Sequence, residues 1–215
     1  MDLATAPFAH LQDLTVSIGE DDQDLDDTLG ALTAALRSTA SSYCGFQLTI
    51  VENQCPVTLA VFTDGPDIPV GTSLRFPLKL VSPVVDPESR AVIFAITPGA
   101  FTDLAADLSY ALGGVPVEQT PAADSRDHRG THVDGQRRAI ELDADLPLLS
   151  RKSGLAGLAE LTVLNRAIGT LVDQGHDIEQ AHQLLVRDAA AAGVEPYVYA
   201  ARIFDGEPTE IRRHA

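Results

Sequence analysis

The sequence predicts an α+β protein, with an antiparallel sheet and its helices in the N-terminal part and three helices alone in the C-terminal part. Two observations predict this class. Runs rich in β-branched and aromatic residues, typical of strands, cluster between residues 46 and 96. Apolar residues recur at helical spacings on both sides of that cluster, and only at such spacings beyond residue 153. One block of strands flanked by helices indicates a sheet covered on one face.

The first helix is expected after the acidic opening of the chain, where Asp21 and Asp22 can cap it. Its apolar face is predicted from residues spaced by four, three and four positions, and it should end near residues 41 and 42. These residues are Leu25, Leu29, Leu32 and Leu36. The neighbouring aspartates lack the glycine and the final glutamate of an EF-hand loop, so a solvated helix N-terminus explains them.

Four strands are predicted to follow. Residues 46–52 and 57–62 form a hairpin around the turn at residues 53–56, and residues 73–80 and 91–96 supply two more strands. Thr97 and Pro98 then have the form of a helix N-cap and first turn. The apolar positions of that second helix continue at helical intervals until two glycines stop it. They are Phe101, Leu104, Ala105, Leu108 and Leu112, followed by Gly113 and Gly114.

A boundary between two domains is expected in the polar stretch that begins at Val115. Residues 115–132 are rich in proline, glycine and charge, which is typical of a linker, although residues 139–142 could add a strand to the N-terminal sheet. The predicted organisation is therefore a sensor-like domain over residues 1–114, a linker over 115–150 and a helical domain over 151–215.

Three helices are predicted in the C-terminal domain. The first is capped by Ser153 and ends at Gly175, and the second starts with Asp177 and Gln180 at capping-box spacing and ends at Gly193. Pro196 opens the third. The residues expected to face the shared core are Leu158, Leu161, Asn165, Ile168, Leu171 and Val172, then Ile178, Ala181, Leu184, Leu185 and Ala189, then Tyr197, Ala200, Ala201, Ile203 and Phe204.

Charge is distributed unevenly along the chain, whose formal net charge is −16. Residues 1–150 carry a net charge of −14, and residues 151–215 carry −2. An acidic surface repels polyphosphate, so any contact with nucleic acid is expected in the C-terminal part.

The chain is expected to be cytoplasmic. Its N-terminus has an acid at position 2 and no basic segment before an apolar run, unlike a secretory signal, and no apolar run approaches the ~20 residues that cross a bilayer. Cys44 and Cys55 are expected to be buried thiols, because a reducing compartment disfavours a disulfide.

No catalytic constellation, metal site or cofactor is predicted. The cluster Asp124, Asp127, His128 and His132 contains residues that bind metals, but Gly130 argues against the helix that would align them, so a solvated loop is expected. His176 and His182 are interpreted as a surface or capping pair. The sequence has no phosphate-binding glycine loop, nucleophile elbow or Cys-His pair, and an enzyme is not expected.

The C-terminal helices resemble the ANTAR family, whose three-helix modules end bacterial regulators. The resemblance covers about 50 residues and lies in the spacing of small and apolar residues, which let short helices approach closely. The matching residues are Asn165, Arg166, Ala167, Ile168, Gly169, Leu171, Gly175, Ala181, Leu184, Leu185, Ala189, Ala200 and Ile203. Residues 24–112 are similar in element order to a GAF-like domain.

The resemblance implies a function in transcription antitermination. ANTAR modules bind paired hairpins in nascent RNA, usually as dimers controlled by an N-terminal receiver or GAF-type domain. The resemblance therefore implies a homodimer here, with an unknown small-molecule or protein signal at the N-terminal domain. Arg166, Arg187 and Arg202 are the candidates for phosphate contact, and Tyr199 is the candidate for stacking on a base.

Two departures from the family pattern leave other functions open. Ile168 stands where the family often has lysine, and Ala192 to Glu195 stand where basic residues often precede the third helix. A protein-interaction or dimerisation module without RNA binding is one alternative, and a small-ligand sensor with a pocket between the sheet and the helix at residues 98–112 is another. Arginines gathered on one exposed face would favour RNA binding, whereas pairing with Glu160, Asp173 or Asp188 would favour the first alternative.

Overall fold

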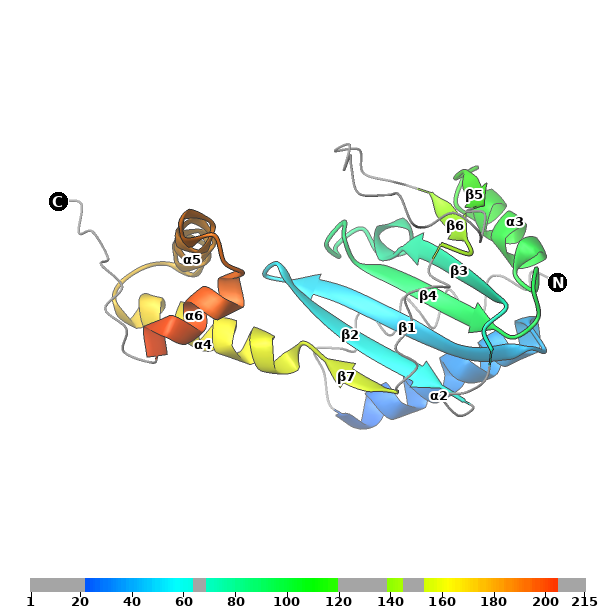
Figure 1. Cartoon of the computed structure of the whole chain (residues 1–215), viewed down its shortest axis with the longest axis horizontal. Helices are drawn as coiled ribbons and strands as arrows, with labels where there is room; N and C mark the ends of the chain where they lie inside the picture. The colour runs from blue at the N-terminus through cyan, green and yellow to red at the C-terminus, as the bar shows by residue number, and fades with distance from the viewer. Residues whose placement is uncertain (1–21, 64–68, 120–138, 145–152, 205–215) are drawn as a thin grey trace. The chain divides into compact units, whose positions relative to one another are not determined.

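The computed structural model describes residues 22–63, 69–119, 139–144 and 153–204, and it is a mixed structure of helices and strands (Figure 1). Five α-helices and one sheet of seven strands lie within these ranges. The elements are α2 (Asp22–Thr39), β1 (Tyr43–Glu52), β2 (Cys55–Phe62), β3 (Thr72–Pro77), the 3-10 helix η1 (Leu78–Leu80), β4 (Arg90–Ala95), α3 (Thr102–Ala111), β5 (Val117–Gln119), β6 (Ile140–Leu142), β7 (Gly154–Ala156), α4 (Leu158–Asp173), α5 (Ile178–Ala192) and α6 (Pro196–Phe204).

The strands follow the order β5-β6-β3-β4-β1-β2-β7 across the sheet (Figure 1). β4 pairs antiparallel with β1 and β3, and β3 pairs antiparallel with β6, whereas β5 and β6 run parallel. The predicted hairpin, the strand at residues 91–96 and the added strand at 139–142 are confirmed. β5 and β7 were not predicted, because three exposed residues carry no alternating pattern. The expectation that residues 115–132 are only a linker is wrong at β5.

The chain forms two compact units. Unit 1 contains residues 1–50 and 59–154, and unit 2 contains residues 51–58 and 155–215. The second unit therefore includes the tip of the β1–β2 hairpin as well as α4, α5 and α6.

The main core of unit 1 lies between one face of the sheet and the helices α2 and α3. Alternate residues of β4 belong to it, since Ala91, Ile93 and Ala95 are buried there with Leu32 of α2 and Leu108 of α3. The other face of the sheet carries a smaller cluster. Its buried members are Cys44, Val92 and Phe94, and the ring of Phe62 stacks on that of Phe94 with centroids 5.6 Å apart.

Two boundary predictions in unit 1 are wrong. The second helix begins at Thr102 and not at Thr97 or Pro98, because Gly99 has a left-handed φ of 76° and residues 97–101 form turns before the helix. The strand predicted for residues 73–80 ends at Pro77, where the 3-10 helix η1 takes over. The predicted apolar face of α3 is confirmed at Phe101, Leu104, Ala105 and Leu108.

The helices of unit 2 share one core, as their apolar spacing predicted. Leu164, Ala167 and Leu171 of α4 are buried with Ala181 and Leu185 of α5 and with Ala200 of α6. The predicted boundaries of α5 are confirmed. The Asp177 carboxylate accepts a hydrogen bond from the Gln180 amide nitrogen at 2.8 Å, Gln180 returns the capping-box bond, and Gly193 ends the helix in a left-handed conformation.

Three predictions in unit 2 are wrong. Ser153 does not cap α4, because its hydroxyl binds the backbone of Phe62 and Gly157 precedes the helix. The buried stripe of α4 runs through Leu164, Ala167, Ile168 and Leu171, so Leu158, Asn165 and Val172 are exposed. On α5 and α6, Ile178 and Tyr197 are also exposed, because both lie at the first turn of their helices, where fewer neighbours cover them.

Candidate functional site

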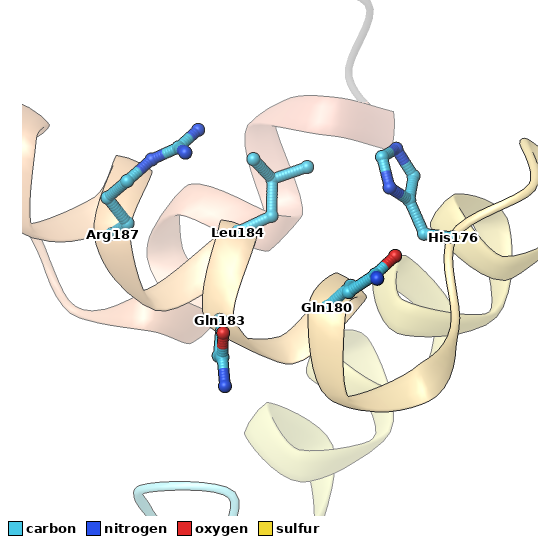
Figure 2. A pocket seen from close by; sticks show the side chains of 5 residues that line it. All are labelled: His176, Gln180, Gln183, Leu184 and Arg187. Carbon is cyan, nitrogen blue, oxygen red and sulfur yellow. The ribbon is translucent and has the colours of Figure 1, made fainter.

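A shallow groove runs along one side of α5 (Figure 2). It has a volume of about 490 Å³ and is lined by His176, Gln180, Gln183, Leu184 and Arg187. Positions 180, 184 and 187 are spaced by four and three, so they follow one face of the helix. In Figure 2 the side chain of Leu184 lies between those of Arg187 and His176. The buried residues Ala181, Leu185 and Ala189 hold the other side of α5 against the core of unit 2.

The groove is lined by neutral amides, an imidazole and one guanidinium. The side-chain oxygen of Gln180 accepts the capping-box bond from the Asp177 amide, which leaves its NH₂ group as a donor. The Gln183 NH₂ group donates to Glu179 at 2.8 Å, which leaves the Gln183 oxygen as an acceptor. No carboxylate lines the groove itself. Such a surface offers hydrogen bonds of both kinds and one cation to a polar partner.

Arg187 is the predicted site residue that lies in this groove. Its side chain is 71% exposed, and both Nε and an Nη atom lie 2.9 Å from the same carboxylate oxygen of Asp188. Consecutive residues of a helix do not face each other, so the long arginine side chain bends back to make this ion pair. An exposed pair of this type is weak, because water screens it. Arg187 therefore retains hydrogen-bond donors for a partner, but Asp188 already offsets part of its positive charge in the free protein.

Tyr199 of α6 lies near this ion pair and packs against the core of unit 2. Burial is the main cause that raises the pKa of the Tyr199 hydroxyl, the charge of Asp188 raises it further, and the charge of Arg187 lowers it. Two of the predicted site residues, Arg187 of α5 and Tyr199 of α6, therefore lie close together. Because the Tyr199 ring is half-buried, part of it is used for packing and only its remainder can stack on a base.

The other two predicted arginines lie on different helices. Arg166 is exposed on α4, and Arg202 is half-buried on α6. The departure at Ile168 has a structural reason, since its side chain is buried in the core where a lysine ammonium would lose its solvation. Glu195 is exposed just before α6, so a negative charge stands at that end of the unit. The pairing of Arg187 with Asp188 counts toward an interaction module, but the pair is exposed and weak, so it does not by itself decide against RNA binding.

Sequence reasoning did not predict the groove. His176 was assigned to a surface or capping pair, Gln180 to the capping box and Leu184 to the core. Gln183 was given no role, and none of the four was expected to form a site with Arg187. The signal was present in the spacing of 180, 184 and 187, which is offset on the helix from the buried residues 181, 185 and 189. Polar residues on an exposed helix face are common, so this spacing alone does not indicate a site.

Other kinds of site find no support in the described residues. Within the ranges that the structure describes, no three His, Cys, Asp or Glu residues gather as a metal-binding group, and the cluster from Asp124 to His132 lies outside those ranges. Cys44 and Cys55 are both buried free thiols, as predicted. The face of α3 proposed for a ligand pocket is packed into the core by Phe101, Leu104 and Leu108. Among the described helices, none combines the length and the apolar character needed to cross a membrane.

Comparison of the chain with protein-family models, curated proteins and solved structures finds no match in any of the three. The ANTAR-like and GAF-like assignments therefore stay predictions from the residues quoted above.

Proposed function

We propose that this protein is a cytoplasmic regulator whose C-terminal helices bind structured RNA through the groove on α5, as an antitermination factor does. The observation that supports the proposal is the composition of the groove, in which Arg187 lines the same surface as Gln180, Gln183 and His176 with no carboxylate among the lining residues. Arginine, glutamine and histidine are side chains that contact phosphates and base edges in RNA. The resemblance of residues 165–203 to ANTAR modules points to the same function.

The charge of the helices limits how strong such binding can be. Residues 155–204 contain three arginines against six carboxylates, a net charge of −3. Few phosphates can be neutralised by so few cations, so most of the binding energy must come from hydrogen bonds and stacking. We therefore expect weak binding with a shallow salt dependence, confined to a folded RNA and lost on random single strands.

Arg187 and Asp188 provide a test with opposite outcomes. In gel-shift titrations of the full chain with an RNA of two adjacent hairpins, we expect Arg187→Ala to weaken binding about tenfold and to lower the slope of log affinity against log salt by about one. Asp188→Asn removes the ion pair, so it should tighten binding by about threefold. Arg90→Ala is the matched control, because Arg90 is exposed on β4 of unit 1. Absence of binding at low salt, or equal effects of all three variants, contradicts the proposal.

A second candidate function is a protein-interaction or dimerisation module. Two exposed apolar side chains on the helices of unit 2 favour it. Ile178 is 71% exposed at the start of α5, and Val172 is also exposed near the end of α4. Covering exposed apolar side chains with a partner removes them from water, which stabilises an interface. If this function is correct, light scattering after size-exclusion chromatography will show a dimer, and Ile178→Gln will shift it toward monomer. A monomer at high concentration contradicts it.

A further inference from the structure

The tip of the β1–β2 hairpin belongs to unit 2, although the rest of both strands belongs to unit 1. Cys55, at the start of β2, is only 3% exposed and lies in the same core as Leu164, Ala167 and Leu185. Burial is the main cause that raises the pKa of its thiol, and the charge of Glu160 raises it further. Cys55 is therefore a neutral core side chain of the helical unit, supplied by a strand of the sheet.

Two hydrogen bonds hold this tip within unit 2. The Cys55 thiol donates to the carbonyl oxygen of Gly157 at 3.8 Å, and the Asn53 amide nitrogen donates to the side-chain oxygen of Asn165 at 3.3 Å. Both acceptors lie in or just before α4. The tip thus contacts the helix both at its beginning and two turns further along.

The backbone at Gly157 shows how closely the tip approaches α4. A Cβ atom at this position would lie 2.2 Å from the carbonyl oxygen of Pro56, a distance that no real side chain shows. Gly157 also has a φ of 90°, which glycine adopts without strain. Any other residue here would push the start of α4 and the hairpin apart.

The turn of the hairpin is itself well defined. Asn53 and Gln54 both have left-handed φ values, 51° and 61°, as a two-residue turn of type I′ requires. Such a turn matches the twist of the two strands, so it fixes where Cys55 lies relative to β1. Beyond the tip, β1 pairs with β4 in one register from Thr49 opposite Arg90 to Gly45 opposite Phe94, and the register shifts between Gly45 and Tyr43.

We propose that the tip of the β1–β2 hairpin couples the sheet to the helical unit: it completes the core of α4, α5 and α6, so that displacing the hairpin loosens all three helices. This inference does not rest on RNA binding. It applies equally if the helices bind a protein. A signal that shifts β1 along β4 would also move the tip, because the tip is part of the same strand. Moving the tip then changes the stability of α4, α5 and α6, because the contacts of a packed element determine how easily it opens locally.

The main test compares two glycine substitutions in the full chain by hydrogen exchange and mass spectrometry. Gly157→Ala separates the tip from α4, so amides of α4, α5 and α6 should exchange about tenfold faster or more, while those of α3 and β4 keep their rates. Gly169→Ala is the matched control, since a Cβ at this exposed position of α4 meets nothing within 4 Å. It should leave exchange unchanged or slow it, because alanine favours a helix. The inference is overturned if Gly157→Ala leaves α5 and α6 as protected as in the unaltered chain.

A milder variant keeps the test decisive if Gly157→Ala unfolds the whole chain. Asn53→Gly preserves the left-handed turn and removes only the bond to Asn165, and Gln54→Gly is its control in the same turn. Both are made in a Cys44→Ala background, where Cys55 is the single thiol. We expect iodoacetamide to label Cys55 about threefold faster in Asn53→Gly than in Gln54→Gly, because its exposure requires the tip to leave the core. Equal labelling rates in the two variants overturn the inference.

Discussion

The ion pair between Arg75 and Glu141 gives the sharpest prediction about the sheet. An Nη atom of Arg75 donates to a carboxylate oxygen of Glu141 across the antiparallel pair of β3 and β6. The two side chains are 27% and 8% exposed, so the carboxylate is nearly removed from water and the guanidinium only partly. Removing one partner of a buried pair costs about 3–5 kcal/mol, because the other charge is left without compensation. The partial exposure of Arg75 reduces this cost, and we expect about 2–3 kcal/mol for Arg75→Met.

Urea unfolding followed by far-UV circular dichroism measures this cost, since the chain has no tryptophan to report by fluorescence. Arg75→Met should lower the midpoint by roughly 1 M, from the typical dependence of stability on urea. The double variant Arg75→Met with Glu141→Leu should recover most of the loss, because no buried charge remains. Arg90→Met on the exposed start of β4 is the control. If Arg75→Met costs no more than Arg90→Met, the reasoning that the pair is electrostatically buried is refuted.

Two other predictions concern a helix cap and a buried hydroxyl. Asp177→Ala removes the capping-box acceptor of α5 and should cost about 1 kcal/mol in thermal or urea unfolding, whereas Asp177→Asn should cost much less; equal losses would show that charge and not the hydrogen bond matters. Burial raises the pKa of the Tyr43 hydroxyl well above its usual range, and Thr33 approaches it without hydrogen-bond geometry. The unfolded chain therefore loses this proton first, near the ordinary tyrosine value of about 10, and stability should fall as pH rises through that value. Tyr43→Phe should reduce that fall in urea midpoints between pH 8 and 10.5, and an unchanged fall would contradict it.

The sequence predicted the elements whose signals are local. The capping box at Asp177, the stop at Gly193 and the proline at the start of α6 depend on neighbouring residues, and the structure has all three. The apolar face of α3 was equally clear, because Phe101, Leu104 and Leu108 recur at helical spacing. Patterns of this kind are read from a few adjacent residues, so tertiary contacts did not need to be known.

The misses come from contacts between distant parts of the chain. Serine is a common helix cap, but the Ser153 hydroxyl accepts a hydrogen bond from the backbone nitrogen of Phe62, 91 positions away. No prediction was made for Glu141, which is buried in β6 and paired with Arg75, 66 positions away in the sequence. The groove on α5 was missed for a different reason. It is formed by polar residues on an exposed face, and such faces look alike whether or not they bind a partner.

The place of Cys55 in the helical core also affects the order in which the protein can fold during synthesis. Asn53 and its partner Asn165 are 112 positions apart. At about 5–20 residues per second, roughly 6–22 s pass between synthesis of the hairpin tip and synthesis of the helix that it contacts. During this time the tip presents an apolar thiol and an unpaired turn to the solvent or to chaperones. The helical core can therefore be completed by the hairpin tip only after the segment around Asn165 has been synthesised.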